Sequence, residues 1–388
     1  MIRRKSYIWF VLLLSLTVLL SACASVPTTR LVSPTQTSVG SPASGTPSSE
    51  GLSWLQVFFT NPNPPDNLAH GIDKNVVPLI DGAKSTIDVA SFDFNLPSVT
   101  NALVNAKKRG VKVRVVVDEV NGNQKLDAIK SAGVETFDAL KALQDAKIPV
   151  TDGGRSNGLM HDKIIIVDGA TLLMGSWNMS HNDTFRNNNN LLEITNPDLI
   201  ANYQAKLNEL FNGKHFGAKA QVGAQKPKLT IDGVQVENYF SPVDNVMDKL
   251  VAYVNGAQKS VRFIAFTYTD HRLSDAMIAR ARAGVTVEGV IENRGASRGA
   301  LLPLVCAKLP IKVDGNKYTM HHKVIIIDDS TVITGSFNFT NAADTANDDN
   351  ILVIHSPEIA ALYNQEFERL NGIAATPPDS EIVCSKVK

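Results

Sequence analysis

One motif occurs twice in this chain and constrains its fold more than any other feature. Both copies read His-x-Lys-x4-Asp-x6-Gly-Ser-x-Asn; the first begins at His161 and the second follows 160 positions later, at His321. No insertion or deletion interrupts the spacing within either copy. A repeat of this length predicts two similar structural units in one chain rather than a solenoid of many short ones.

Each copy predicts a β-hairpin with polar side chains gathered at one end. In the first copy, four apolar residues follow Lys163, as in a strand buried on both faces. An Asp-Gly pair with turn chemistry then leads into a short apolar return strand. Antiparallel pairing about that turn would place Gly175 opposite Lys163 and Asn178 near His161. An imidazole, an ammonium and an amide at one hairpin end can together hold an anion.

The similarity of the two halves extends beyond the motif. At an offset of 174 positions, residues 108–111 match residues 282–285, and strand-like and helix-like stretches alternate in both halves. Such alternation predicts a mixed sheet covered by helices in each half. The offset then falls to 160, so the first half carries 14 extra residues. We place them around 138–152, as a loop that could discriminate substrates, and expect a helix over 124–132.

Residues 1–22 have the layout of a bacterial signal peptide. Three basic residues at positions 3–5 precede an apolar stretch that is too short to span a membrane with confidence. The stretch ends in Leu-Ser-Ala-Cys, which resembles a lipobox and implies lipid attachment to Cys23 after cleavage. The alternative is an ordinary signal peptide with an incidental cysteine. Residues 23–52, rich in Ser, Thr, Pro and Gly, predict a flexible tether.

The charge balance bears on the class of substrate. The full chain has 38 basic and 38 acidic residues. Removal of the leader takes away three basic residues, which leaves 35 basic against 38 acidic and a net charge of −3. A nucleic-acid binder usually shows a basic excess, so any basic surface here would have to be local.

Two cysteines remain after Cys23. In an extracytoplasmic protein Cys306 and Cys384 could form a disulfide, or they could stay separate thiols, because spacing alone does not fix geometry. They lack the spacing of a zinc site.

Two histidines and two lysines around one anion suggest phosphoryl chemistry, for which we expect neither a metal nor a cofactor. One imidazole can attack phosphorus, and the other can protonate the leaving alkoxide and then activate water. The remaining polar motif residues can hold the non-bridging oxygens, where charge develops. The candidate phosphate-binding residues are Lys163, Lys323, Asn178, Asn338, Ser176 and Ser336.

The doubled motif resembles that of the phospholipase D superfamily, and the resemblance covers residues 54–375. It implies an α/β fold of two tandem phospholipase D-like α/β/α sandwich halves, related by pseudo-two-fold symmetry, with a shared active site. It also implies that His161 is the nucleophile and His321 the general acid. The expected segments are a first half at 53–212, a linker at 213–228, a second half at 229–375 and a C-terminal tail at 376–388.

The acidic residues near the motif are expected to differ in role. We interpret the motif residues Asp168 and Asp328 as mainly structural, because each lies at the turn. In this family a carboxylate 14 residues beyond the motif Gly orients a histidine. That position is Asp349 in the second copy but Asn189 in the first, where Glu193 could substitute. If Asp349 backs the histidine of its own copy, that histidine is the more basic and could be the nucleophile instead.

The favoured function is hydrolysis of a phospholipid headgroup phosphodiester through a phospho-histidine intermediate. The protein is expected to be a monomeric, extracytoplasmic lipoprotein, anchored to a bacterial membrane through Cys23. Three alternatives stay open: an extracytoplasmic endonuclease acting on nucleic acid, a transferase similar to cardiolipin synthase, and a non-catalytic binding lipoprotein.

Overall fold

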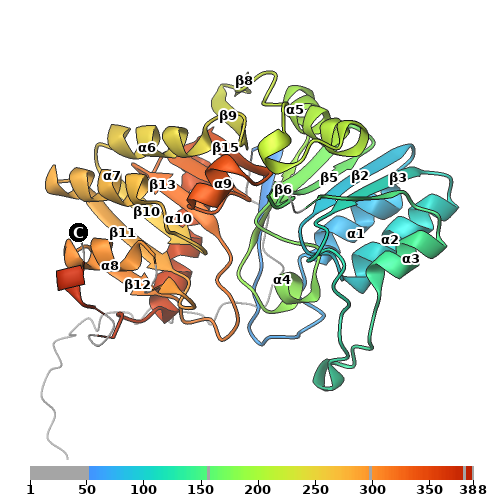
Figure 1. Ribbon diagram of the computed structural model, residues 1–388, viewed down its shortest axis with the longest axis horizontal. Coiled ribbons are helices and arrows are strands. Elements are labelled where there is room, and N and C mark those ends of the chain that lie inside the picture. The colour runs from blue at the N-terminus through green and yellow to red at the C-terminus, as the bar shows by residue number, and fades with distance from the viewer. Residues whose placement is uncertain (1–51, 155–157, 297–298, 379–381, 387–388) are drawn as a thin grey trace, which may run out of the picture. The chain divides into compact units, whose positions relative to one another are not determined.

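The computed structural model describes residues 52–154, 158–296, 299–378 and 382–386. The predicted signal peptide, Cys23 and nearly all of the predicted tether lie outside these residues. Within them the chain forms two mixed sheets with helices packed on both (Figure 1). No helix in this described part is long and apolar enough to cross a bilayer.

The first half is built on a seven-stranded sheet. Its strands are β1 (Leu55–Phe59), β2 (Thr86–Ser91), β3 (Lys112–Val117), β4 (Val150–Asp152), β5 (Lys163–Val167), β6 (Thr171–Gly175) and β7 (Asn190–Ile194). They lie in the order β1-β7-β6-β5-β2-β3-β4, with β2, β3 and β4 parallel and the other neighbours antiparallel. The helices are α1 (Asp73–Gly82), α2 (Pro97–Lys108), α3 (Ala139–Asp145), α4 (His181–Phe185) and α5 (Pro197–Asn208), which continues into one π turn (Glu209–Gly213).

The second half repeats this plan. Its strands are β8 (Lys228–Ile231), β9 (Val234–Ser241), β10 (Ser260–Ala265), β11 (Thr286–Ile291), β12 (Ile311–Val313), β13 (Lys323–Ile327), β14 (Thr331–Gly335) and β15 (Asp349–His355). Their order, β12-β11-β10-β13-β14-β15-β9-β8, mirrors the first sheet with β9 in the place of β1 and β8 added at the edge. The helices are α6 (Val246–Gly256), α7 (His271–Arg282), α8 (Leu301–Cys306), α9 (Asn341–Thr345) and α10 (Pro357–Ile373). The predicted fold of two similar α/β halves is therefore confirmed.

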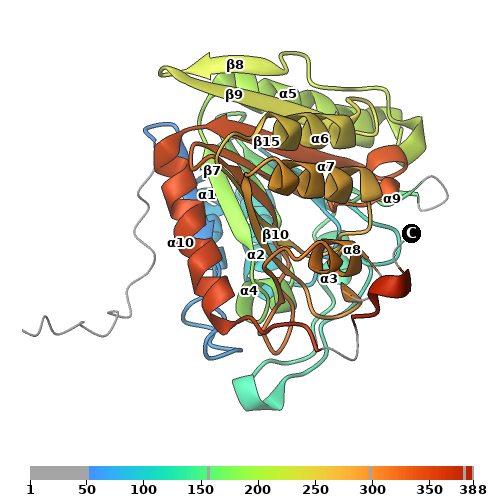
Figure 2. The same cartoon turned by 90° about the vertical axis from the view of Figure 1, so that its left-hand side faces the viewer.

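Both faces of the motif strands are buried, which explains their unbroken apolar sequence. Ile164 and Ile166 of β5 pack in a core shared by both halves, whereas Ile165 packs in a core of the first half alone. Helices α5 and α10 add Tyr203 and Tyr363 to the shared core, and Figure 2 shows α10 running beside β7. Helices α1, α2 and α3 cover the outer face of the first sheet, and α6, α7 and α8 that of the second (Figure 1).

Twelve of the 14 extra residues (174 − 162) precede α3 and form a projecting arm at 118–138, so the predicted insertion at 138–152 is wrong. β3 and β11 are offset by 174 positions, but the following helices, α3 and α8, are offset by 162. The predicted helix at 124–132 is also wrong. Bridges from Leu126 to Phe137 and from Ile129 to Val134 make a short hairpin around a 3-10 turn (Lys130–Ala132). In Figure 1 this arm is the teal segment that extends away from the sheet.

The two cysteines of the folded part form a disulfide. The Cys306–Cys384 bond joins the end of α8 to a 3-10 turn (Cys384–Lys386), with an S–S distance of 2.00 Å and 5.5 Å between the Cα atoms. Just before the predicted tail, Ala375 makes a β-bridge to Val313 of β12. Of the two alternatives for these cysteines, the structure has the paired one.

Candidate active site

The motif hairpins have the register expected from the sequence. Ile164 pairs with Met174, and the same register extended by one residue places Gly175 opposite Lys163. Gly175 has φ +149°, and a Cβ there would lie 2.4 Å from the carbonyl oxygen of Asn190 on the neighbouring strand. The glycine therefore leaves room for the β7 backbone rather than for an anion.

Each motif histidine is placed by a β-bridge to the opposite half. The amide of His161 donates to the carbonyl of Asp348 at 3.0 Å, and the amide of His321 donates to the carbonyl of Asn188 at 2.9 Å. The bridges pair Met160 with Asp348 and Asn188 with Met320, both in parallel. The segment beyond each motif consequently lies beside the histidine of the other copy.

The side-chain hydrogen bonds of the histidines are crossed in the same way. His161 Nδ1 lies 2.7 Å from Asp349 Oδ1, and His321 Nδ1 lies 2.9 Å from Asn189 Oδ1. The interpretation that Asp349 backs His321 is therefore wrong, because the bridges turn each residue toward the opposite copy. The carboxylate expected behind His321 lies behind His161 instead, which removes the argument for His321 as nucleophile. An Nδ1–H donated to these oxygens makes Nε2 the unprotonated nitrogen of each neutral ring.

The two lysines reinforce the shared site from within their own copies. Lys163 Nζ donates to the carbonyl of His161, and Lys323 Nζ donates to the carbonyl of His321 at 2.7 Å. All four residues are at most 7% exposed. Two ammonium groups and two imidazoles thus occupy one largely dry site.

A phenyl ring, which the motif does not contain, lies beside each His-Lys pair. The Phe92 ring centroid is 4.7 Å from that of His161, edge to face, and the Phe266 centroid is 4.6 Å from that of His321. The lysine ammonium of the same copy lies 5.1 Å from the first ring and 4.7 Å from the second. The aromatic faces attract the ammonium groups and help to exclude water. Both residues follow β2 or β10 at the offset of 174 positions, which is the signal that could have identified them.

Burial governs the protonation of the site. Burial, together with the charge of Lys163, holds the pKa of His161 well below its ordinary value of 6.5. Burial and the Lys323 ammonium likewise hold the pKa of His321 well below 6.5. Burial also lowers the pKa of Lys163 to about 8 and raises that of Asp349 to about 7. A bound anion would favour the charged forms of the lysines and of one histidine.

The motif serines support the residues behind the histidines. Ser176 Oγ donates to Asn189 Oδ1 at 2.9 Å, and Ser336 Oγ donates to Asp349 Oδ1 at 2.6 Å. Both serines are fully buried. A hydroxyl has one hydrogen to donate, so the predicted donation from Ser176 and Ser336 to phosphate does not fit this geometry.

The motif asparagines have different surroundings. Asn178 Nδ2 donates to Asp183 Oδ2 at 2.6 Å, and Asn178 Oδ1 accepts from the amide of Asp93 at 3.3 Å. Asn338 is half-buried, and its buried Oδ1 has no hydrogen-bond partner among the described residues. Asp183, which the sequence interpretation missed, lies 3.6 Å from His321 Nδ1 through its Oδ2.

The remaining acidic candidates lie away from the histidines. Asp168 accepts hydrogen bonds from the amides of residues 84–86, and Asp328 from those of residues 258–260, at the turn ends of the hairpins. Glu193 pairs in register with Leu173 on β6, toward the same turn end. Glu193 therefore does not replace Asn189 beside His321.

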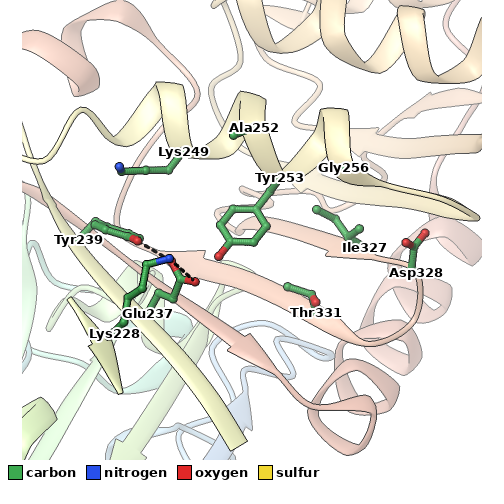
Figure 3. Close-up of a pocket in the computed structure, with 10 residues that line it drawn as sticks. All are labelled: Lys228, Glu237, Tyr239, Lys249, Ala252, Tyr253, Gly256, Ile327, Asp328 and Thr331. Atoms are coloured by element: carbon green, nitrogen blue, oxygen red, sulfur yellow. Dashed lines mark hydrogen bonds and ion pairs between the residues drawn. The ribbon is translucent and has the colours of Figure 1, made fainter. Parts of the chain in front are cut away.

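A separate polar hollow lies on the second half. Figure 3 shows it between α6 and β9, where the Lys228 ammonium lies 3.3 Å from the carboxylate of Glu237, which also accepts from Tyr239. Its volume is about 510 Å³, and Asp328 contributes to its lining. Because Lys323 begins β13 and Asp328 follows its other end, this hollow is not part of the histidine site.

Comparison with known proteins places this geometry in a family. A family model described as "Cardiolipin synthase, PLD-like domain" matches residues 76–211 and 250–371, which include both motif copies. A mitochondrial cardiolipin hydrolase from Xenopus laevis is 33% identical over 129 residues, covering 33% of this chain and 61% of that protein. A phospholipase D from Rickettsia bellii is 33% identical over 135 residues, covering 34% of this chain and 67% of that protein. The chain thus spans about three fifths to two thirds of the length of these relatives.

A solved structure has the same overall fold at low sequence identity. The crystal structure of phosphatidylserine synthase from Haemophilus influenzae aligns with a TM-score of 0.63 at 14% identity, covering 83% of this chain and 87% of that one. This likeness concerns the fold and spans both halves. Because the family model matches both halves of the duplicated α/β fold, the chain belongs to the phospholipase D superfamily.

Proposed function

We propose that this chain is a phosphodiesterase that hydrolyses the headgroup phosphodiester of a phospholipid through a covalent phospho-histidine. The observation that carries the proposal is the crossed arrangement of the two histidines. Each half supplies one imidazole and one ammonium, and the other half supplies the group that orients the imidazole. An isolated half would therefore lack the second imidazole, the second ammonium and the group that orients its own imidazole.

In the first step His161 acts as the nucleophile. Burial keeps its imidazole neutral, and donation from Nδ1–H to Asp349 leaves the Nε2 lone pair free to attack phosphorus. The P–N bond forms as the P–O bond to the headgroup breaks. The leaving alkoxide takes a proton from His321 Nε2, and the headgroup alcohol departs. Lys163 and Lys323 stabilise the charge on the non-bridging oxygens.

In the second step water replaces the histidine. His321, now neutral, takes a proton from a water molecule whose oxygen attacks phosphorus. The P–N bond breaks, and its electron pair returns to His161 Nε2. The products are a phosphate monoester and the restored enzyme, with His321 protonated again. Both steps need only side chains of this chain and water.

The substrate assignment rests on the relatives and on charge. Two similar proteins are named as a cardiolipin hydrolase and a phospholipase D. The net charge of −3 expected after removal of the leader does not favour a polyanion. We assign the chain to an extracytoplasmic, membrane-anchored location through Cys23, and the Cys306–Cys384 disulfide supports an oxidising compartment.

The test is a substrate comparison on purified residues 53–388 in the presence of EDTA. We expect release of choline, ethanolamine or glycerol from phospholipid vesicles and little digestion of plasmid or single-stranded DNA. DNA digestion without headgroup release would reassign the chain as a nuclease. Transfer of the phosphatidyl group to an added alcohol in preference to water would reassign it as a transferase. A lack of turnover with every diester would leave a binding lipoprotein.

A further inference from the structure

The two candidate catalytic histidines do not have equivalent partners. Asp349 places a carboxylate oxygen 2.7 Å from His161 Nδ1, whereas Asn189 places a neutral amide oxygen 2.9 Å from His321 Nδ1. A general acid must be protonated before it acts, and a neutral amide does little to stabilise an imidazolium. His321 therefore needs a negative charge from another position.

We propose that Asp183 is the positioning carboxylate of His321 and takes over the role that Asp349 has for His161; this inference rests on the proposed function. Asp183 Oδ2 lies 3.6 Å from His321 Nδ1, beyond direct hydrogen bonding but within ion-pair distance. Asp183 is 3% exposed, so its charge is little screened by water. Its Oδ2 also accepts from Asn178 Nδ2 at 2.6 Å, which fixes the carboxylate beside the motif.

The local fold does not require an acidic residue at this position. Asp183 is the third residue of α4, a helix capped by Ser180. The equivalent residue of α9, which Thr340 caps in the same way, is Ala343. The two helices have the same length, so the carboxylate is not needed to form α4. Asp183 belongs to the half in which Asn189 stands where the other half has Asp349. Its carboxylate turns toward His321, the histidine beside Asn189.

The charges around His321 explain why this carboxylate matters. Lys323, Lys163 and His161 all lower the pKa of His321, in addition to burial. Asp183 opposes them, and the charge of His321 is in turn the largest of the effects that lower the pKa of Asp183 against burial. Asp93 also faces Asp183, and burial with this like charge raises the pKa of Asp93 to about 7. Asp183 is thus the carboxylate of this group that is held ionised.

The test exploits the leaving group. In the full chain, Asp183→Asn should lower kcat/KM for phosphatidylcholine vesicles by about 50-fold, since an alkoxide needs a general acid. With p-nitrophenyl phosphocholine the loss should be less than about threefold, because nitrophenolate leaves without a proton. The alkaline limb of the kcat/KM profile should also move to lower pH, by about one unit, as His321 loses its counter-charge.

Two further variants separate positioning from structure. Asp183→Ala copies Ala343 of the second half and should fold with a lower Tm, because Asn178 and Asn187 lose a buried hydrogen-bond acceptor, while showing the same leaving-group dependence. Asn189→Asp in the Asp183→Asn background moves the carboxylate to the position that Asp349 occupies. It should recover activity on phosphatidylcholine to within about fivefold of wild type.

The outcomes distinguish this inference from the proposed function. A wild-type chain that hydrolyses neither substrate would defeat the proposed function itself. An active wild type with equal losses on both substrates, or with no loss in Asp183→Asn, would overturn only the role of Asp183. Failure of both Asp183 variants to fold would assign Asp183 to stability and would also overturn that role.

Discussion

The two halves of this protein share a skeleton and differ in the polar groups around their histidines. Strand order, hairpin register, the caps of α4 and α9 and the His-Lys-Phe cluster recur almost without change. The partners of the histidines do not: Asp349 backs His161, and Asn189 with Asp183 backs His321. The two halves therefore share their packing, whereas the division between nucleophile and general acid depends on very few side chains.

The largest expected effect is the loss of turnover when either histidine is replaced, and it should differ between the two. His161→Ala should abolish turnover of every diester, by at least about 10⁴-fold, because no covalent intermediate forms. His321→Ala should lose about 10³-fold on phospholipid. With p-nitrophenyl phosphocholine it should still release a burst of nitrophenol and accumulate phospho-histidine, detectable by acid-quench and mass spectrometry. A phosphoryl group found on His321 would reverse the roles of the two halves.

The next largest effect should follow the replacement of Asp349, the carboxylate partner of His161. Asp349→Asn keeps the shape of the side chain but removes the charge that fixes the His161 tautomer, so kcat/KM should fall by about 10²- to 10⁴-fold whatever the leaving group. Glu193→Gln is a matched control, since Glu193 is a half-buried carboxylate at the other end of β7, and it should stay within about twofold. Comparable losses in both variants would mean that the loss does not arise from the hydrogen bond between Asp349 and His161.

The same pair predicts a pH dependence. Burial raises the pKa of Asp349 to about 7, so the carboxylate is ionised above that pH and takes up a proton below it. The kcat/KM of the wild type should therefore fall about tenfold per unit as the pH drops below 7. The Asp349→Asn variant should lack this limb. A limb retained in the variant would assign the titration to another group.

A smaller effect should be confined to the second half. The Cys306–Cys384 bond closes a separation of 78 residues, so Cys306→Ser should lower the free energy of unfolding by about 3 kcal/mol. Amide exchange should rise in α8 and not in its counterpart α3, because no cysteine lies in that helix. The kcat/KM on p-nitrophenyl phosphocholine should stay within about twofold. Uniform destabilisation of both sheets would show that the halves unfold as one unit.

The smallest effect should come from the arm that only the first half has. Replacing residues 124–136 with a short Gly-Ser turn should change the free energy of unfolding by less than about 1 kcal/mol, since most of the arm is exposed. Turnover of the soluble nitrophenyl substrate should not change, whereas KM for phospholipid vesicles should rise severalfold if the arm discriminates substrates. Equal behaviour on both substrates would exclude that role.

The sequence predicted the architecture well because its strongest signal is a repeat. A doubled, gap-free motif on apolar strands is enough to predict two α/β halves, their hairpin register and the two histidines. It could not place the insertion, since the change of offset occurs somewhere between residues 118 and 160 and no matching residues mark the point. The arm resembled a helix because Leu126 and Ile129 are three apart, but each pairs with a residue across the hairpin.

The partners of the histidines were beyond the reach of sequence for a different reason. A repeat shows which residues are equivalent, but it does not show which copy a side chain will contact. The natural guess that Asp349 serves its own copy failed because the bridge between Met160 and Asp348 crosses the halves. Asp183 gave no repeat signal at all, because its equivalent is Ala343.

The crossed hydrogen bonds have a consequence for how such a site can specialise. Two identical halves associating as a symmetric dimer would give both imidazoles the same neighbours. A substitution that made one imidazole a better nucleophile would then change the other imidazole in the same way. Joining the halves in one polypeptide removes that constraint, because each position can then change alone. Asn189 and Asp349 occupy equivalent positions with different charge, an asymmetry that a homodimer of either half would forbid.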